Sequence, residues 1–155
     1  MVIQRWQSVL LLIAAALMAC FTFIPLGQIT TTDFTFYLKT LGIFQEGIPT
    51  DNVAPIEIKT WYLFMMSLTT LVLIVIDIFL FKNLGFQRKV CLICILFVIA
   101  DTTVAGFTGF CGIEGGSIWW SSNALTPFIS ILALAMAYWR MTSDSNKLRA
   151  ADRIR

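Results

Sequence analysis

Four long apolar segments, separated by polar and turn-forming stretches, dominate the pattern of hydrophobic and polar positions along the chain. They cover approximately residues 6–25, 61–81, 90–109 and 124–139. A helix needs about 20 apolar residues to cross the hydrocarbon core of a bilayer, and each segment reaches or approaches that length. The pattern predicts an all-α membrane protein, a four-transmembrane-helix bundle that forms a single integral membrane domain over residues 1–155.

The segments outside the spans differ in character. Residues 26–60 form a long outer loop in which Thr and Phe alternate over 32–36, a pattern that favours strands. We predict a small antiparallel sheet here, with an irregular packed loop as the alternative. The second outer segment, CGIEGGSIWWSSN, is expected to be a short flexible connection. The tail, residues 141–155, predicts either a short helix capped by Ser143 or Asp144 or a frayed basic end.

Composition supports a bilayer as the surrounding medium and first partner. The chain is 58% hydrophobic and 13% charged, whereas soluble domains are roughly 45–50% apolar and about 25% charged. One small soluble core cannot enclose that much apolar surface. We expect contact with lipid, and a membrane-protein partner or a second copy of the chain, but no nucleic acid.

Lysine and arginine predict the orientation, because cytoplasmic loops carry an excess of these residues. On one side lie Arg5, Lys82, Arg88, Lys89, Arg140, Lys147, Arg149, Arg153 and Arg155. On the other lie only Lys39 and Lys59. This distribution predicts that both termini face the cytoplasm. The tryptophans, which favour membrane interfaces, fall at predicted span ends: Trp6, Trp61, Trp119, Trp120 and Trp139.

Each predicted span carries a stripe of small or hydroxyl residues, because residues spaced by three, four or seven share a helix face. Membrane helices associate through such faces, so we expect all four stripes to point inward. The stripes of the second and third spans are Ser67, Thr70 and Asp77, and Cys91, Cys94, Val98, Asp101, Ala105 and Thr108. Those of the first and fourth are Ser8, Ala15, Ala19 and Thr22, and Thr126, Ser130, Ala133 and Ala137.

Two aspartates interrupt the apolar runs, and an aspartate at mid-span costs about 2.5–3.5 kcal/mol on insertion scales. For Asp101 we expect hydrogen bonds from Thr102, Thr103 or hydroxyls of the other stripes. For Asp77 we expect a cytoplasmic cation, Arg5 or Arg88. The two carboxyls should lie about 10 Å apart in depth, too far to share one proton. A structural role is favoured, with proton transport and subunit contact as the alternatives.

Enzyme signatures are sparse. Histidine is absent, which excludes a Ser-His-Asp triad, a Cys-His pair and a His metal site. No phosphate-binding glycine motif occurs, and we expect no catalytic residue, cofactor or metal. The CLIC sequence of residues 91–94 resembles the motif of four-span quinone-linked thiol oxidoreductases. It lies at the cytoplasmic end, however, and the outer region offers only Cys111.

Three stretches carry a resemblance that covers essentially the whole chain: VIQRWQSVLLLIAA, FLFKNLGFQRKVC and LRAADRIR. They resemble a family of small four-span membrane proteins from Bacteroidota that share a domain of unknown function. The resemblance implies a bacterial inner-membrane protein and brings no activity. Its most telling residues predict a cytoplasmic-face cluster: Gln4, Arg5, Gln7, Lys82, Asn83, Gln87, Asp152, Arg153 and Arg155.

The function predicted from these features is that of a non-catalytic accessory, assembly or scaffold subunit of an inner-membrane complex. A small proton-coupled carrier that uses Asp101 is the second hypothesis. A membrane thiol oxidoreductase that uses Cys91 and Cys94 is the third.

Overall fold

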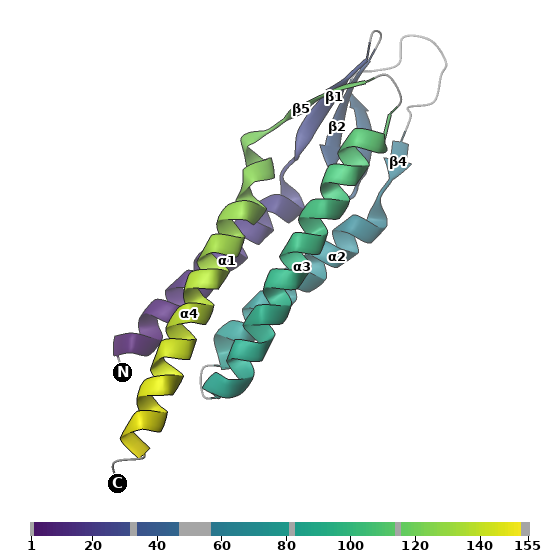
Figure 1. Ribbon diagram of the computed structural model, residues 1–155. Coiled ribbons are helices and arrows are strands. Elements are labelled where there is room, and N and C mark those ends of the chain that lie inside the picture. The colour runs from purple at the N-terminus through teal and green to yellow at the C-terminus, as the bar shows by residue number, and fades with distance from the viewer. Residues whose placement is uncertain (1, 32–33, 47–56, 81–82, 114–115, 153–155) are drawn as a thin grey trace.

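Four long helices and one small sheet dominate the described part of the protein (Figure 1). The computed structural model describes residues 2–31, 34–46, 57–80, 83–113 and 116–152. The helices are α1 (Val2–Phe23), α2 (Trp61–Phe79), α3 (Leu84–Cys111) and α4 (Thr126–Asp152), with a short 3-10 helix η2 (Ser122–Leu125) before α4. The strands are β1 (Gly27–Thr30), β2 (Thr35–Lys39), β3 (Gly42–Glu46), β4 (Glu57–Lys59) and β5 (Ser117–Trp120). The predicted fold class, a four-helix bundle with a sheet between the first two helices, is confirmed.

The helices form a ring in which α1 packs against α2 and α4, and α3 packs against the same two helices. The beginning of α1, the end of α4, the end of α2 and the beginning of α3 lie at one end of the bundle, and the sheet lies at the other (Figure 1). Each helix is long and apolar enough to cross a membrane. The described cations Arg88, Lys89 and Arg140 belong to the end with the termini, whereas Lys39 and Lys59 belong to the sheet.

The sheet is antiparallel with strand order β4-β3-β2-β1-β5. The Thr and Phe alternation over 32–36 predicted a strand, and β2 begins within it, at Thr35. In β2, Phe36 and Leu38 are buried and alternate with more exposed neighbours. The expectation for the second outer segment was wrong, because β5 pairs with β1 from Gly27↔Trp120 to Thr30↔Ser117. This pairing joins segments far apart in the sequence, and a four-residue strand gives almost no local signal.

The helices that contain the last two predicted spans are longer than those spans. Helix α3 has 28 residues, so it extends beyond the predicted span 90–109. Helix α4 continues from the predicted span 124–139 to Asp152 without a break. Ser143 and Asp144 therefore lie inside a helix and are not its N-cap, and the helix continues beyond Trp139. Residues 140–152 contain neither glycine nor proline, the residues that most strongly disfavour a helix.

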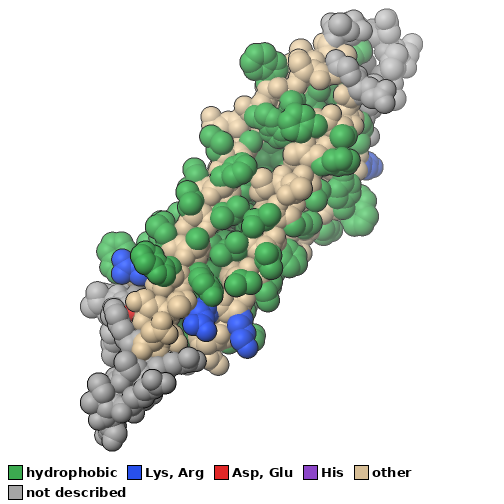
Figure 2. Space-filling model, in the orientation of Figure 1, with side chains coloured by type: hydrophobic (Ala, Val, Ile, Leu, Met, Phe, Trp, Pro, Cys, Tyr) green, Lys and Arg blue, Asp and Glu red, His purple; other side chains and the backbone are tan. Residues whose placement is uncertain are grey.

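In α2, α3 and α4, the side chains of the predicted stripes are buried or half-buried, as expected for helix faces that point inward. The whole predicted stripe of α3 is buried, as are Ser67, Thr70 and Asp77 of α2. In α1 only Thr22 of the predicted stripe is buried, because Ser8, Ala15 and Ala19 each lie one position from the buried face. That face consists of Gln7, Leu11, Ala14, Met18, Phe21 and Thr22. Figure 2 shows the hydrophobic side chains that cover the helices outside, with most Lys and Arg toward the end with the termini.

Candidate functional site

Asp101 lies in the centre of α3, fully buried, and contacts α2. The Thr70 hydroxyl donates a hydrogen bond of 2.6 Å to Asp101 Oδ2, and both side chains are 0% exposed. Of the predicted partners, Thr102 and Thr103 bond instead to carbonyls of their own helix. The hydroxyl that reaches Asp101 comes from the stripe of α2, so Asp101 joins two helices.

In the Asp101–Thr70 contact, one hydroxyl proton has two possible acceptors and one carboxyl oxygen has no donor within the described part of the chain. Thr70 Oγ1 also lies 3.0 Å from the carbonyl oxygen of Met66, although a hydroxyl has only one proton to donate. Asp101 Oδ1 is buried and has no hydrogen-bond partner among the described residues. A buried carboxyl with an oxygen that lacks a partner has the features expected of a proton-binding site in a membrane protein.

Asp77 lies nearer the α2–α3 connection in a second polar region. Gln87, at the beginning of α3, donates a hydrogen bond of 3.1 Å to the backbone carbonyl of Asp77. Neither carboxyl oxygen of Asp77 has a hydrogen-bond partner among the described residues. Arg88, one of the two cations predicted to pair with Asp77, therefore does not bond to it. Thr70, the partner of Asp101, precedes Asp77 by seven residues, or about 10 Å along the helix. The two carboxyls therefore belong to separate sites, as predicted.

Polar side chains also tie α4 to its neighbours in the ring. Cys91 of α3 donates to the carbonyl of Leu134 at 3.5 Å. Ser130 donates to the carbonyl of Ala14 in α1 at 3.4 Å. Near the termini, Gln7 donates to Asp144 Oδ2 at 2.5 Å. The segment expected to be a tail thus supplies a partly buried contact of the bundle.

At the sheet end, a relay of threonines joins α1 to α2. Thr60 precedes α2 and donates to the carbonyl of Thr40 at 3.0 Å, and Thr40 donates to the carbonyl of Thr22 at 2.6 Å. Asn123 of η2 donates to the carbonyls of Cys20 and Ile24, both at 3.1 Å. Sequence reasoning missed Thr40, Thr60 and Asn123, because loop threonines and asparagines give no signal until their partners are known.

The predicted cytoplasmic-face cluster is only partly described. Gln7 and Gln87 are buried, but their described partners, Asp144 and the backbone of Asp77, lie on different helices. Asn83 is exposed at the beginning of α3 and makes no side-chain cap. The side chains of the other members lie outside the described residues: Gln4, Arg5, Lys82, Asp152, Arg153 and Arg155. A common cluster of all nine therefore stays a prediction.

The four cysteines are free thiols, and Cys20 in α1 is half-buried. Cys91 and Cys94 are fully buried in α3, and Cys111 is exposed at the far end of that helix. Twenty residues of helix separate Cys91 from Cys111, which is about 30 Å. Within the described part of the chain, no group of three or more His, Cys, Asp or Glu side chains could hold a metal ion.

Two grooves mark the sheet end of the bundle. The larger has a volume of about 520 Å³ and lies between α3 and the segment from Trp120 to Phe128, over the end of α1. The smaller, of about 370 Å³, is lined by Trp119 and the ends of α1 and β1. Neither is lined by Asp77 or Asp101.

The helices and their contacts define a multi-pass membrane protein, a four-helix bundle whose buried polar side chains join neighbouring helices. Residues 3–154 match the family described as Domain of unknown function (DUF4293). The chain belongs to this family, which confirms the resemblance to a family of unknown function over nearly its whole length. No curated protein matches the chain.

Proposed function

We propose that this protein is a non-catalytic accessory, assembly or scaffold subunit of a bacterial inner-membrane complex, with both termini in the cytoplasm. The Bacteroidota origin implied by the sequence resemblance belongs to the same proposal. The observation that carries it is that the buried polar side chains of the bundle bond to neighbouring helices: Thr70–Asp101, Gln87–Asp77, Cys91–Leu134, Ser130–Ala14 and Gln7–Asp144.

These contacts give Asp101, Gln7 and Gln87 a structural role without a reaction, whereas the carboxyl of Asp77 has no hydrogen-bond partner among the described residues. Hydrogen bonds between membrane helices contribute about 0.6 kcal/mol each on average, and they specify which helix faces meet. A polar group left unbonded in the bilayer interior is costly, so contacts of this kind select one arrangement of the four helices. A rigid bundle with an apolar exterior is suited to hold a partner in the membrane.

Purification from the native membrane tests the proposal. The tagged protein is extracted in mild detergent, and the co-purifying chains are identified by mass spectrometry. We expect a membrane protein in a fixed ratio, or a second copy of the chain, that survives dilution. A chain that purifies alone as a monomer at every concentration contradicts the proposal.

A proton-coupled carrier is the second candidate, favoured by the unpartnered Oδ1 of Asp101. A protonated carboxyl would donate to Thr70, whose own proton would then serve the Met66 carbonyl. Proton release and uptake at Asp101 would break and remake the contact with α2. A carrier needs an access route to this group, whereas Asp101 is 0% exposed.

Asp101→Asn and Thr70→Val separate the two candidates. In the structural role, we expect Thr70→Val to lower the free energy of unfolding, and the two variants to show a coupling of about 0.6 kcal/mol and at most about 1.7 kcal/mol in a double-mutant cycle. The measurement is unfolding in detergent, followed by tryptophan fluorescence.

Proton flux into liposomes, followed with an internal pH dye, supplies the second readout. The structural role predicts the same flux in wild type and Asp101→Asn. A carrier predicts a flux that Asp101→Asn abolishes while the fold persists, and Thr103→Val, an exposed hydroxyl on the same helix, serves as the matched control.

The orientation can be tested with the native thiols. Cys111 is exposed at the sheet end, whereas Cys91 and Cys94 are buried. A membrane-impermeant maleimide added to spheroplasts should label the wild type, and Cys111→Ser should remove most of the label. In a Cys111→Ser background, Asn83→Cys should react only after the membrane is opened. Labelling of Asn83→Cys in sealed spheroplasts would reverse the proposed topology.

The thiol oxidoreductase hypothesis has the weakest support in the geometry. Cys91 donates its proton to the Leu134 carbonyl, and both CLIC thiols are enclosed by neighbouring helices. A mixed disulfide trapped at Cys91 or Cys94 would support redox chemistry. A Cys91→Ser/Cys94→Ser double variant with full biological activity would eliminate it.

A further inference from the structure

The larger groove has a shape and position suited to a long alkyl chain. Its floor is formed by Phe21, Leu26 and Ala105, which are 1%, 1% and 4% exposed. Gly106 on α3 and Phe128 on α4 form opposite walls. The volume of about 520 Å³ lies within the range of about 300–1,000 Å³ that is typical of small-molecule sites.

The groove opens on the surface that contacts lipid. Leu125 and Phe128 on its rim are 59% and 54% exposed, and both belong to the fourth candidate span. Phe107, beside Gly106 on α3, is 70% exposed. The groove is thus continuous with the lipid-facing surface, so the surrounding acyl chains reach it without crossing water.

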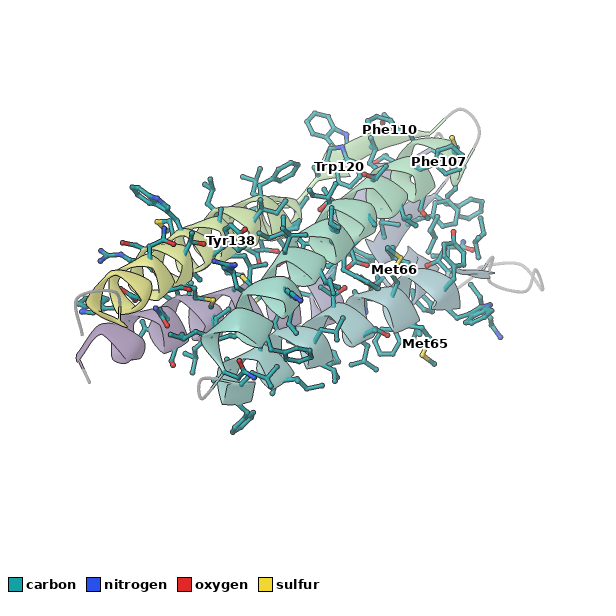
Figure 3. The ribbon with its side chains drawn as sticks, turned by 60° about the horizontal axis from the view of Figure 1, so that its bottom comes forward. Met65, Met66, Phe107, Phe110, Trp120 and Tyr138 are labelled. Atoms are coloured by element: carbon teal, nitrogen blue, oxygen red, sulfur yellow. The ribbon has the colours of Figure 1, made fainter. Side chains whose placement is uncertain are left out.

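The upper end of the groove is polar and lies at the level of the membrane interface. Trp120, Ser121 and Ser122 line it, and tryptophan favours the headgroup level of a bilayer. Trp120 packs edge-on against Phe110 with ring centroids 5.9 Å apart, and Figure 3 shows these two side chains together near Phe107 at the sheet end of α3. Hydroxyls at one end and apolar walls below match the polarity of a phospholipid.

We propose that the groove between α3 and the η2–α4 segment holds one acyl chain of a phospholipid from the leaflet on the sheet side. The chain lies along Gly106, between α3 and Phe128, and the glycerol region lies beside Ser121 and Ser122. The site goes beyond the accessory function, because a lipid held there need not depend on any protein partner.

Gly106 provides a variant that fills the groove without disturbing the bundle. A Cβ placed on Gly106 would meet nothing within 4 Å, whereas one on Gly109 would lie 2.7 Å from both Ile118 Cδ1 and Trp120 Cη2. Gly106→Leu therefore occupies the space of the acyl chain. Gly85→Leu is the matched control, because Gly85 lies in the same helix, is exposed and has only Asn83 Oδ1 within 4 Å, at 3.8 Å.

The test uses Trp120 as the reporter. The other tryptophans, Trp6, Trp61, Trp119 and Trp139, are 64–75% exposed and are replaced by phenylalanine. Phosphatidylcholine brominated on the acyl chain near the headgroup is titrated into the protein in mild detergent, and bromine quenches indole fluorescence on contact. We expect saturable quenching that unbrominated lipid reverses.

Gly106→Leu should weaken the apparent affinity about tenfold, because the lipid loses contact with one or two methylene groups, and Gly85→Leu should leave it unchanged. If Gly106→Leu does not fold, Leu125→Ala, at an exposed rim position, should weaken binding several-fold instead. Quenching that rises linearly without saturation, or that neither variant weakens, overturns the proposal. So does protection of Trp120 that grows with protein concentration, since a second copy would then cover the groove.

Discussion

Ser130→Leu is expected to lower the free energy of unfolding by about 1–3 kcal/mol, the typical cost of overpacking. Ser130 is 0% exposed, and its Oγ lies 3.4 Å from the Ala14 carbonyl of the neighbouring helix. A leucine side chain is larger by two non-hydrogen atoms and cannot fit without moving α4 away from α1. Because α1 and α4 share the most extensive helix contact of the bundle, the shift removes contacts along both helices.

Two matched variants separate packing from hydrogen bonding at this position. Ser130→Ala removes only the hydroxyl and should cost about 0.6 kcal/mol. Ala135→Leu adds the same side chain to α4 at an exposed position and should change little. Thermal unfolding in detergent, followed by tryptophan fluorescence, measures all three. Equal stability of Ser130→Leu and Ala135→Leu would show that α1 and α4 do not meet at Ser130.

Gly27→Val is expected to detach β5 from the sheet. A Cβ on Gly27 would lie 2.8 Å from the Trp119 carbonyl oxygen and 3.4 Å from Trp120 Cα. These are backbone atoms, so no rotamer change relieves the clash. Gly27 pairs with Leu38 on one side and Trp120 on the other, and β5 is the edge strand, so we expect β5 to move. The cost should be about 1–3 kcal/mol.

Hydrogen exchange provides the local measurement for Gly27→Val. The backbone amides of β5 should exchange faster, whereas those of α2 and α3 should keep their protection. Gln28→Val is the control, because Gln28 is the exposed neighbour in the same strand and valine favours strands. Unchanged protection of β5 in Gly27→Val would contradict the close approach of the two strands.

The length of the apolar segments predicted the helices well, because a segment that crosses a bilayer must satisfy its backbone polar groups within itself and does so as a helix. The inward stripes of α2 and α3 also followed from spacing alone, since small and hydroxyl residues pack between membrane helices. The stripe of α1 was shifted, because alanines lie on both of its faces and Leu11 and Met18 occupy the interior. The spacing of residues shows which side chains share a helix face, but the packing of neighbouring helices decides which face is buried.

The sequence likewise predicted some features of the candidate site and not others. The two aspartates were predictable as buried polar groups, because their cost in a bilayer stands out against the apolar runs. The partner of Asp101 was not, because choosing Thr70 over Thr102 requires the relative rotation of α2 and α3. Asp144 appeared to be a cap in a tail, whereas α4 continues and carries it to Gln7.

By itself, the sequence determined that the chain forms four membrane-spanning helices with a sheet between the first two, because hydrophobic length and composition act locally along the chain. Only the tertiary structure decided the partners: Thr70 for Asp101, β1 for β5, and the groove beside Gly106. Each depends on the distance and rotation between segments far apart in sequence. Those are set by the packing of all four helices together, which no single segment encodes.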